Sequence, residues 1–216
     1  MHNFSNRHVV VTGGTGALGK AVVDALRDSG AVCHVASRET LGDLADEAAV
    51  ARFYAGLPAL WASIHVAGGY ASAPIVSTDK AFLEAQLDTN LMSAYLCSRA
   101  AVARMRKSGG GGRIVNVASR PALEPRLGAG SIAYTVAKAA VAALTTALGQ
   151  ELAKEDILVN AVAPSMMDTP ANRAAMPDGD FAAWPKVAEV AGTILFLASP
   201  ANTVARGAVV PVYGRS

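Results

Sequence analysis

The stretch VVVTGGTGALGKAVVDAL, residues 9–26, changes its pattern halfway along. Residues 9–11 form a β-branched run typical of a buried strand, and from Ala17 onward apolar residues recur at helical spacing. Four glycines separate the two patterns: Gly13, Gly14, Gly16 and Gly19. Glycines between a strand and a helix serve ordinary turns, but they also let the backbone approach a pyrophosphate that faces the helix N-terminus. The position of these glycines favours a dinucleotide-binding site.

The composition favours one α/β domain that spans residues 1–216. Hydrophobic residues make up 52% of the chain and charged residues 17%, which suits strands that helices cover on both faces. With a net charge of +2 and no block of like charges, we expect no nucleic-acid partner. No apolar run reaches the roughly 18 residues of a membrane span, and the polar N-terminus lacks a signal peptide's apolar core. These features predict a cytoplasmic protein without a membrane partner.

Strand and helix patterns alternate along the chain. Strands are expected at 8–12, 31–37, 62–67, 113–119, 157–163 and 208–212, and helices at 17–29, 46–55, 79–107, 134–154 and 187–198. This alternation predicts right-handed crossovers and a Rossmann-type, doubly wound parallel sheet with helices on both faces. Such sheets bind ligands at the carboxyl ends of their strands. The glycine run 109–112 precedes a strand, so we interpret it as a helix-to-strand connection at the opposite edge.

The end of the second expected strand bears on the choice of cofactor. An acidic residue there would favour the ribose hydroxyls of NAD, but this chain has Ser37 and Arg38. A guanidinium forms bidentate bonds to phosphate, so Arg38 favours the 2′-phosphate of NADP(H), with NAD(H) possible. The alternative is a solvated arginine in a surface loop. No metal is expected, because the two cysteines and four histidines form no ligand-like cluster.

The segment SIAYTVAKAAVAAL, residues 131–144, places Tyr134 and Lys138 on one helix face, four positions apart. A phenol with a pKa of about 10 is a weak acid–base catalyst at neutral pH, and a nearby ammonium lowers that pKa by stabilising the phenolate. The spacing also occurs by chance on surface helices. Here it follows a strand that ends at Ser119, in a chain that already carries a dinucleotide loop.

Taken together, these motifs resemble the short-chain dehydrogenase/reductase family over essentially the whole chain. The matching pieces are TGGTGALG (12–19), DL (43–44), VAGG (66–69), TN (89–90), IVNVAS (114–119), YTVAK (134–138), VNAVAPS (159–165) and DTP (168–170). The resemblance implies a nicotinamide-dependent oxidoreductase that acts on a carbonyl or quinonoid small molecule. Its implied catalytic residues are Asn90, Ser119, Tyr134 and Lys138.

The resemblance also implies a role for each of these residues. Tyr134 would exchange the proton at the substrate oxygen, and Ser119 would hydrogen-bond that oxygen. Lys138 would lower the pKa of Tyr134 and bind the nicotinamide ribose, while Asn90 would hold a water that links Lys138 to solvent. The implied cofactor-binding residues are Gly13, Thr15, Gly16, Ala17, Leu18, Ser37, Arg38, Asp43, Leu44, Ala67, Gly68, Gly69, Tyr134, Lys138, Pro164, Met166, Met167 and Thr169.

The chain is shorter than the family pattern between its second and fourth strands. Only four residues separate Arg38 from Asp43, whereas a parallel crossover needs a dozen or more, so we expect the third strand of the family to be missing. This compactness, with the segment 167–184, is similar to the quinonoid dihydropteridine reductase branch. That enzyme has an acidic residue in place of Arg38 and lacks the serine. Residues 165–186 are expected to form a substrate loop.

Two further expectations concern assembly and the class of function. The expected helices 79–107 and 134–154 carry more apolar and small residues than one buried face needs, and relatives pair these helices in dimers or tetramers. A homodimer or homotetramer is therefore expected, with complete burial inside the monomer as the alternative. A non-catalytic NAD(P)-sensing protein is the alternative function, but sensors of this kind lose the tyrosine or lysine that this chain retains.

Overall fold

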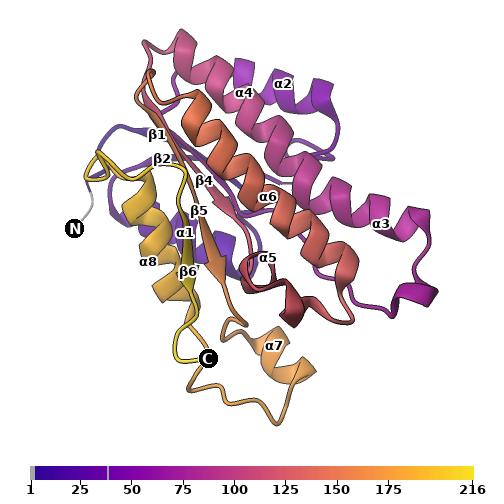
Figure 1. Ribbon diagram of the computed structural model, residues 1–216. Coiled ribbons are helices and arrows are strands. Elements are labelled where there is room, and N and C mark those ends of the chain that lie inside the picture. The colour runs from indigo at the N-terminus through magenta and orange to yellow at the C-terminus, as the bar shows by residue number, and fades with distance from the viewer. Residues whose placement is uncertain (1–2, 38) are drawn as a thin grey trace.

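The computed structural model describes residues 3–37 and 39–216, and they form one parallel sheet with helices around it (Figure 1). Within the described residues the strand order is β2-β1-β3-β4-β5-β6. The strands are β1 (His8–Thr12), β2 (Val32–Ala36), β3 (Ala62–His65), β4 (Gly112–Val117), β5 (Ile157–Pro164) and β6 (Val209–Val212). Val11 of β1 pairs with Val35 on one side and Ile64 on the other. The predicted Rossmann-type architecture is confirmed.

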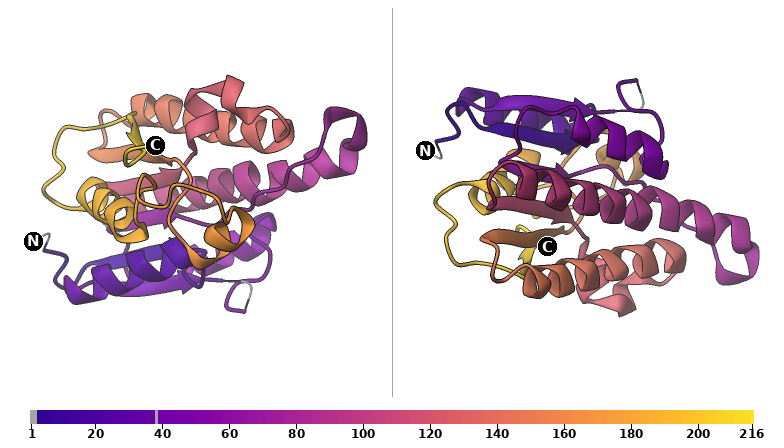
Figure 2. Two further views of the ribbon diagram at one scale, coloured as in Figure 1. Left: turned by 90° about the horizontal axis from the view of Figure 1, so that it is seen from below. Right: turned by 90° about the horizontal axis from the view of Figure 1, so that it is seen from above.

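Helices cover both faces of the sheet (Figure 2). One layer contains α1 (Ala17–Asp28) and α8 (Val187–Ala198), and the other contains α2 (Glu47–Ala55), α4 (Ser93–Lys107) and α6 (Ile132–Glu151). Side chains alternate along a strand, so Val9 and Val11 join the core under α1 and α8, whereas Val10 joins the core under α2 and α4. Two separate cores result, one on each side of the sheet.

The shortened region follows the expectation. After β2 the chain turns tightly, because the Thr40 hydroxyl donates to the Val35 carbonyl at 2.9 Å and Leu41 N donates to the Ser37 carbonyl. The described residues then run directly into α2, whose N-cap Asp46 accepts a hydrogen bond from Ala49 N. No strand lies between β2 and β3 in the described part of the chain, which leaves β2 at the edge of the sheet. Arg38 lies outside the described residues.

The prediction of one continuous α-helix over residues 79–107 is wrong at the centre of that range. The structure has α3 (Lys80–Leu87), a π-helical turn at Asp88–Met92 and then α4. The Asn90 side-chain amide donates to the Gln86 carbonyl at 3.1 Å, which is the acceptor that an α-helix reserves for the backbone N–H of residue 90. Sequence periodicity did not reveal this turn, because it depends on a side chain that bonds backbone elsewhere in the fold.

Other differences are smaller. Helix α6 begins two residues earlier than expected, and the short helices α5 (Arg120–Leu123) and α7 (Pro170–Ala175), with 3₁₀ turns at Ile75–Ser77 and Pro125–Gly128, were not anticipated. The glycine run 109–112 connects α4 to β4, as expected. By length and composition α6 could cross a membrane. In this fold α6 packs on the sheet and buries Lys138 and Thr145.

Candidate active site

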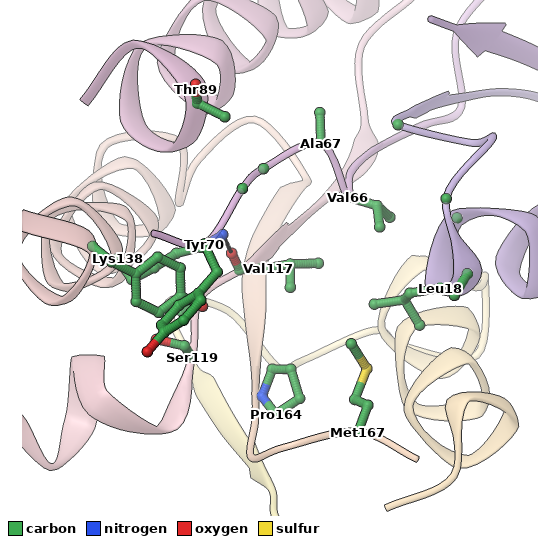
Figure 3. Close-up of a pocket in the computed structure, with 18 of the residues that line it drawn as sticks. Leu18, Val66, Ala67, Tyr70, Thr89, Val117, Ser119, Lys138, Pro164 and Met167 are labelled. Carbon is green, nitrogen blue, oxygen red and sulfur yellow. Dashed lines mark hydrogen bonds between the residues drawn. The ribbon is translucent and has the colours of Figure 1, made fainter. Parts of the chain in front are cut away.

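A cleft of about 1300 Å³ opens at the carboxyl ends of the strands. Most of the expected site residues line it: Gly13, Thr15, Gly16, Ala17, Leu18, Ser37, Asp43, Leu44, Ala67, Gly68, Gly69, Ser119, Tyr134, Lys138, Pro164, Met166, Met167 and Thr169. We call the part lined by Ser37, Asp43 and Leu44 the nucleotide end, and the part lined by Ser119, Tyr134 and Lys138 the catalytic end. Figure 3 shows Lys138 and Ser119 on one side of Pro164, and Leu18 and Met167 on the other.

The glycine loop brings backbone unusually close to backbone. Gly13 has φ of 66°, and a Cβ atom there would lie 2.7 Å from the Ala67 backbone. The Thr12 hydroxyl accepts a hydrogen bond from Ala67 N at 3.2 Å, which holds the two segments together. Gly16, the N-cap of α1, is exposed and faces the cleft. An exposed glycine at a helix N-terminus fits a pyrophosphate, because nothing prevents close approach to the backbone N–H groups.

Lys138 is the buried cation of the catalytic end. Only 5% of Lys138 is exposed, and its Nζ donates to the Val117 carbonyl at 2.7 Å, the bond drawn in Figure 3. Burial lowers its pKa to about 8, because removal from water disfavours the ammonium form. The ammonium still predominates at neutral pH.

Tyr134 and Ser119 stand near this lysine on α6 and at the end of β4. Burial raises the pKa of the Tyr134 phenol, Tyr70 raises it further, and the nearby Ser119 hydroxyl opposes both. Burial is thus the largest influence on this phenol, and the expectation that Lys138 lowers its pKa stays a prediction. Ser119 Oγ is buried without a hydrogen-bond partner among the described residues. An unpaired hydroxyl at this position is suited to a ligand oxygen.

Asn90 lies behind the cleft rather than in its wall. Its Oδ1 accepts from Gly69 N at 3.1 Å, and its Nδ2 donates to the Gly69 carbonyl at 2.9 Å. A Cβ atom on Gly68 would lie 2.8 Å from Asn90 Oδ1 and 3.2 Å from Lys138 Nζ. Asn90 thus fixes the glycine segment after β3 beside Lys138, a positioning role that its place in the sequence did not indicate.

The first half of the expected substrate loop, up to Met176, contributes residues to the cleft wall. Thr169 caps α7 by accepting from Asn172 N at 3.1 Å, and the Asn172 side chain donates to the Met167 carbonyl at 2.8 Å. Met167 packs against the core beneath α1 and α8, whereas Met166 is 41% exposed. The loop therefore presents adaptable apolar side chains to the cleft.

Tyr70 and Arg120 are among the cleft-lining residues that the sequence analysis did not single out. Tyr70 is 66% exposed, and its ring meets the Tyr134 ring edge-on at 5.0 Å between centroids. Arg120 follows Ser119 directly and also lines the cleft. Both residues immediately follow motifs that were recognised, and proximity to those motifs was the available signal.

Comparisons with known proteins identify the family of this chain. A family model described as enoyl-(acyl carrier protein) reductase matches residues 6–214. Galactitol 2-dehydrogenase of Rhizobium johnstonii is 34% identical over 97% of this chain and 94% of its own length. The 3-oxoacyl-[acyl-carrier-protein] reductase MabA of Mycobacterium tuberculosis is 30% identical over 98% and 93%, respectively.

The fold comparison gives the same result. A short-chain type dehydrogenase/reductase from Mycobacterium ulcerans superposes with a TM-score of 0.88 at 26% identity, covering 99% of this chain and 90% of that one. The match to the family model spans nearly the whole chain, and the relatives cover it equally fully. The chain belongs to the short-chain dehydrogenase/reductase family of NAD(P)-dependent oxidoreductases.

Proposed function

We propose that this protein reduces a carbonyl or quinonoid carbon of a small molecule with NADPH, using Tyr134 as its acid–base group. The observation that carries the proposal is the unpaired, buried Ser119 hydroxyl next to Tyr134 and Lys138, in a cleft that begins at the glycine loop. The names of the relatives, galactitol 2-dehydrogenase and 3-oxoacyl reductase, support interconversion of hydroxyl and carbonyl groups.

Each residue of the catalytic end has a distinct task in this reaction. The raised pKa of Tyr134 keeps the phenol protonated at neutral pH, so that it can donate its proton to the substrate oxygen. Ser119 donates a hydrogen bond to the same oxygen as negative charge develops. The Lys138 ammonium stabilises the phenolate left on Tyr134 until a solvent proton restores it. When bound, the nicotinamide supplies the hydride to the substrate carbon.

The remaining expected residues would hold the cofactor. Gly13, Gly16 and the N-terminus of α1 would bind the pyrophosphate, and Asp43 with Leu44 would flank the adenine. Arg38 would pair with the 2′-phosphate, which supports NADPH over NADH. Thr169 and Met167 would contact the nicotinamide end from the substrate loop.

A quinonoid dihydropterin is a second candidate substrate. The exposed Tyr70 ring stands against Tyr134 and offers an aromatic surface to a flat conjugated ring. The resemblance of residues 167–184 to the dihydropteridine reductase branch supports the same substrate. Simple ketones and quinonoid rings differ in how they distribute developing charge, so they place different demands on Ser119.

The deciding experiment is a cofactor-oxidation assay. Purified protein is mixed with NADPH or NADH and a panel of ketones, quinones and quinonoid dihydropterins, and the loss of nicotinamide absorbance is followed. We expect turnover with at least one class and faster turnover with NADPH. Tight cofactor binding without turnover on the whole panel would instead favour a non-catalytic sensor.

Two expectations about the setting of the protein complete the proposal. Ile132 and Val136 are exposed on α6 by 43% and 49%, and Tyr95 is exposed on α4. These side chains would be covered in a homodimer or homotetramer paired through residues 79–107 and 134–154. A cytoplasmic location would give the protein direct access to NADPH.

A further inference from the structure

Charged residues are unevenly distributed around the cleft. Three carboxylates occur among its described lining residues, namely Glu39, Asp43 and Asp88. Glu39 and Asp43 follow β2, and Asp88 shares a second, smaller hollow with Asp43, so all three belong to the nucleotide end. Among the described residues that line the catalytic end and the substrate loop, the charged side chains are Lys138 and Arg120. An anion at this end faces these cations and no side-chain carboxylate among the described lining residues, which here include Ser216, the last residue of the sequence.

The guanidinium group of Arg120 is held along one edge by Glu124 and on one face by Tyr213. Its Nε donates to Glu124 Oε1 at 3.1 Å, and its Nη2 donates to Glu124 Oε2 at 3.3 Å. The guanidinium carbon lies 4.6 Å from the centre of the Tyr213 ring. The side chain is only 28% exposed. Arg120 therefore has little freedom, and less entropy is lost when it binds a ligand.

The opposite edge of the guanidinium is available. A guanidinium has five N–H donors in a rigid fork, and Glu124 occupies two of them. None of the described residues accepts a hydrogen bond from Nη1 of Arg120. Glu124 is absent from the described cleft lining, whereas Arg120 and the preceding Ser119 both line it. Lys138 donates one of its three N–H groups to the Val117 carbonyl, and its ammonium is assigned to the Tyr134 phenolate in the proposed reaction, which leaves Arg120 as the candidate for a second anionic group.

We propose that Arg120 is a specificity-determining residue that binds a carboxylate on the substrate, so that the protein prefers oxo acids or hydroxy acids to their neutral analogues. The proposal rests on the proposed function, since the carbonyl of the same molecule has to reach Tyr134 and Ser119. A carboxylate matches the fork of an arginine edge and forms charge-assisted hydrogen bonds. Such bonds correspond to about a 10- to 100-fold preference.

The test compares an acid with its primary amide. In the parent protein, kcat/KM for 4-oxocyclohexanecarboxylate should exceed that for 4-oxocyclohexanecarboxamide by about tenfold or more. Arg120→Gln should abolish this ratio while changing kcat/KM for the amide by less than about threefold, and Arg120→Lys should give an intermediate ratio. Arg126→Gln is the matched control, because Arg126 is exposed, lies on the same connection and is outside the cleft lining. It should retain the parent ratio.

A binding measurement separates this proposal from the proposed function. Calorimetric titration of the NADPH-loaded protein with cyclohexanecarboxylate and with its amide should show tighter binding of the acid, lost in Arg120→Gln. This result without turnover on any ketone would contradict the proposed function and still support the role of Arg120. Equal binding of acid and amide by the parent, or an unchanged preference in Arg120→Gln, would overturn the role of Arg120 whatever the turnover.

Discussion

The two ends of the cleft differ in how deeply their polar groups are buried. At the catalytic end, Lys138 and Ser119 are 5% and 4% exposed, whereas Glu39 and Asp43 at the nucleotide end are exposed. Buried groups interact strongly because the local dielectric is low, and exposed charges are screened by water and salt. Changes at the catalytic end should therefore lower activity by several orders of magnitude. Changes at the nucleotide end should alter cofactor affinity by about one order of magnitude.

The largest effect is expected at Tyr134. Tyr134→Phe keeps the ring but removes the transferable proton, so kcat should fall by about 10² to 10⁴-fold. Steady-state assays on any substrate that the protein reduces measure this loss. Tyr95→Phe, on the exposed surface of α4, serves as the control and should retain activity. Full turnover by Tyr134→Phe would contradict the acid–base assignment.

The effect of Ser119→Ala should depend on the substrate. With a simple ketone, charge develops on one oxygen, and loss of the serine hydrogen bond should lower kcat by roughly 10²-fold. With a quinonoid dihydropterin, charge spreads into the conjugated ring, and the loss should be small. Ser108→Ala, at the end of α4, should change neither rate. Undiminished ketone reduction by Ser119→Ala would exclude the proposed role of Ser119.

Burial of Lys138 predicts a pH dependence of stability. Its pKa is about 8 in the fold, against 10.5 for an ordinary lysine. Between these values the unfolded chain binds the additional proton, so the free energy of unfolding should rise with pH. Relative to Lys138→Met, the parent should gain up to about 3 kcal/mol from pH 8 to 10.5. Denaturant titrations at several pH values measure this difference. If the free energy of unfolding changed with pH equally in the two proteins, the pKa of Lys138 would not be lowered by folding.

At the nucleotide end the expected effect is smaller. The parent should bind NADPH about tenfold or more tightly than NADH, because charge-assisted hydrogen bonds to the 2′-phosphate need Arg38. Arg38→Asp should reverse the preference in equilibrium titrations. Arg27→Asp makes the same charge change in the last turn of α1 and should leave the preference intact. Equal affinities in the parent would contradict this assignment.

The last prediction concerns the oligomeric state, measured as the molecular mass in solution, and no change in activity is expected. Light scattering at micromolar concentration should give a dimer or tetramer for the parent. Val136→Glu places a charge on the exposed face of α6 and should shift the mass toward the monomer. Val204→Glu, at a position 85% exposed outside the helices, should not. A monomeric parent would mean that α6 has no partner helix.

Local patterns in the sequence were sufficient for much of the fold and site. Residues 9–26 predict a strand, a glycine turn and a helix, because β-branching, glycine and helical spacing each act over a few neighbouring residues. The number of residues after Ser37 is itself too small for a further crossover, so the missing strand could be predicted from the sequence. The motif residues fall at strand ends, which a parallel sheet brings to one edge. The family and the location of the cleft followed from these features.

Other properties depended on the tertiary structure, because they come from contacts between distant segments. The π-helical turn at Asp88–Met92 accompanies bonds from Asn90 to Gly69, twenty-one positions earlier in the chain. The raised pKa of Tyr134 reflects burial, which a four-residue spacing to Lys138 could not predict. Arg120 gained its fixed orientation from Tyr213 at the far end of the chain. Local propensity determined the elements, and packing decided the environment, and hence the chemistry, of the side chains they carry.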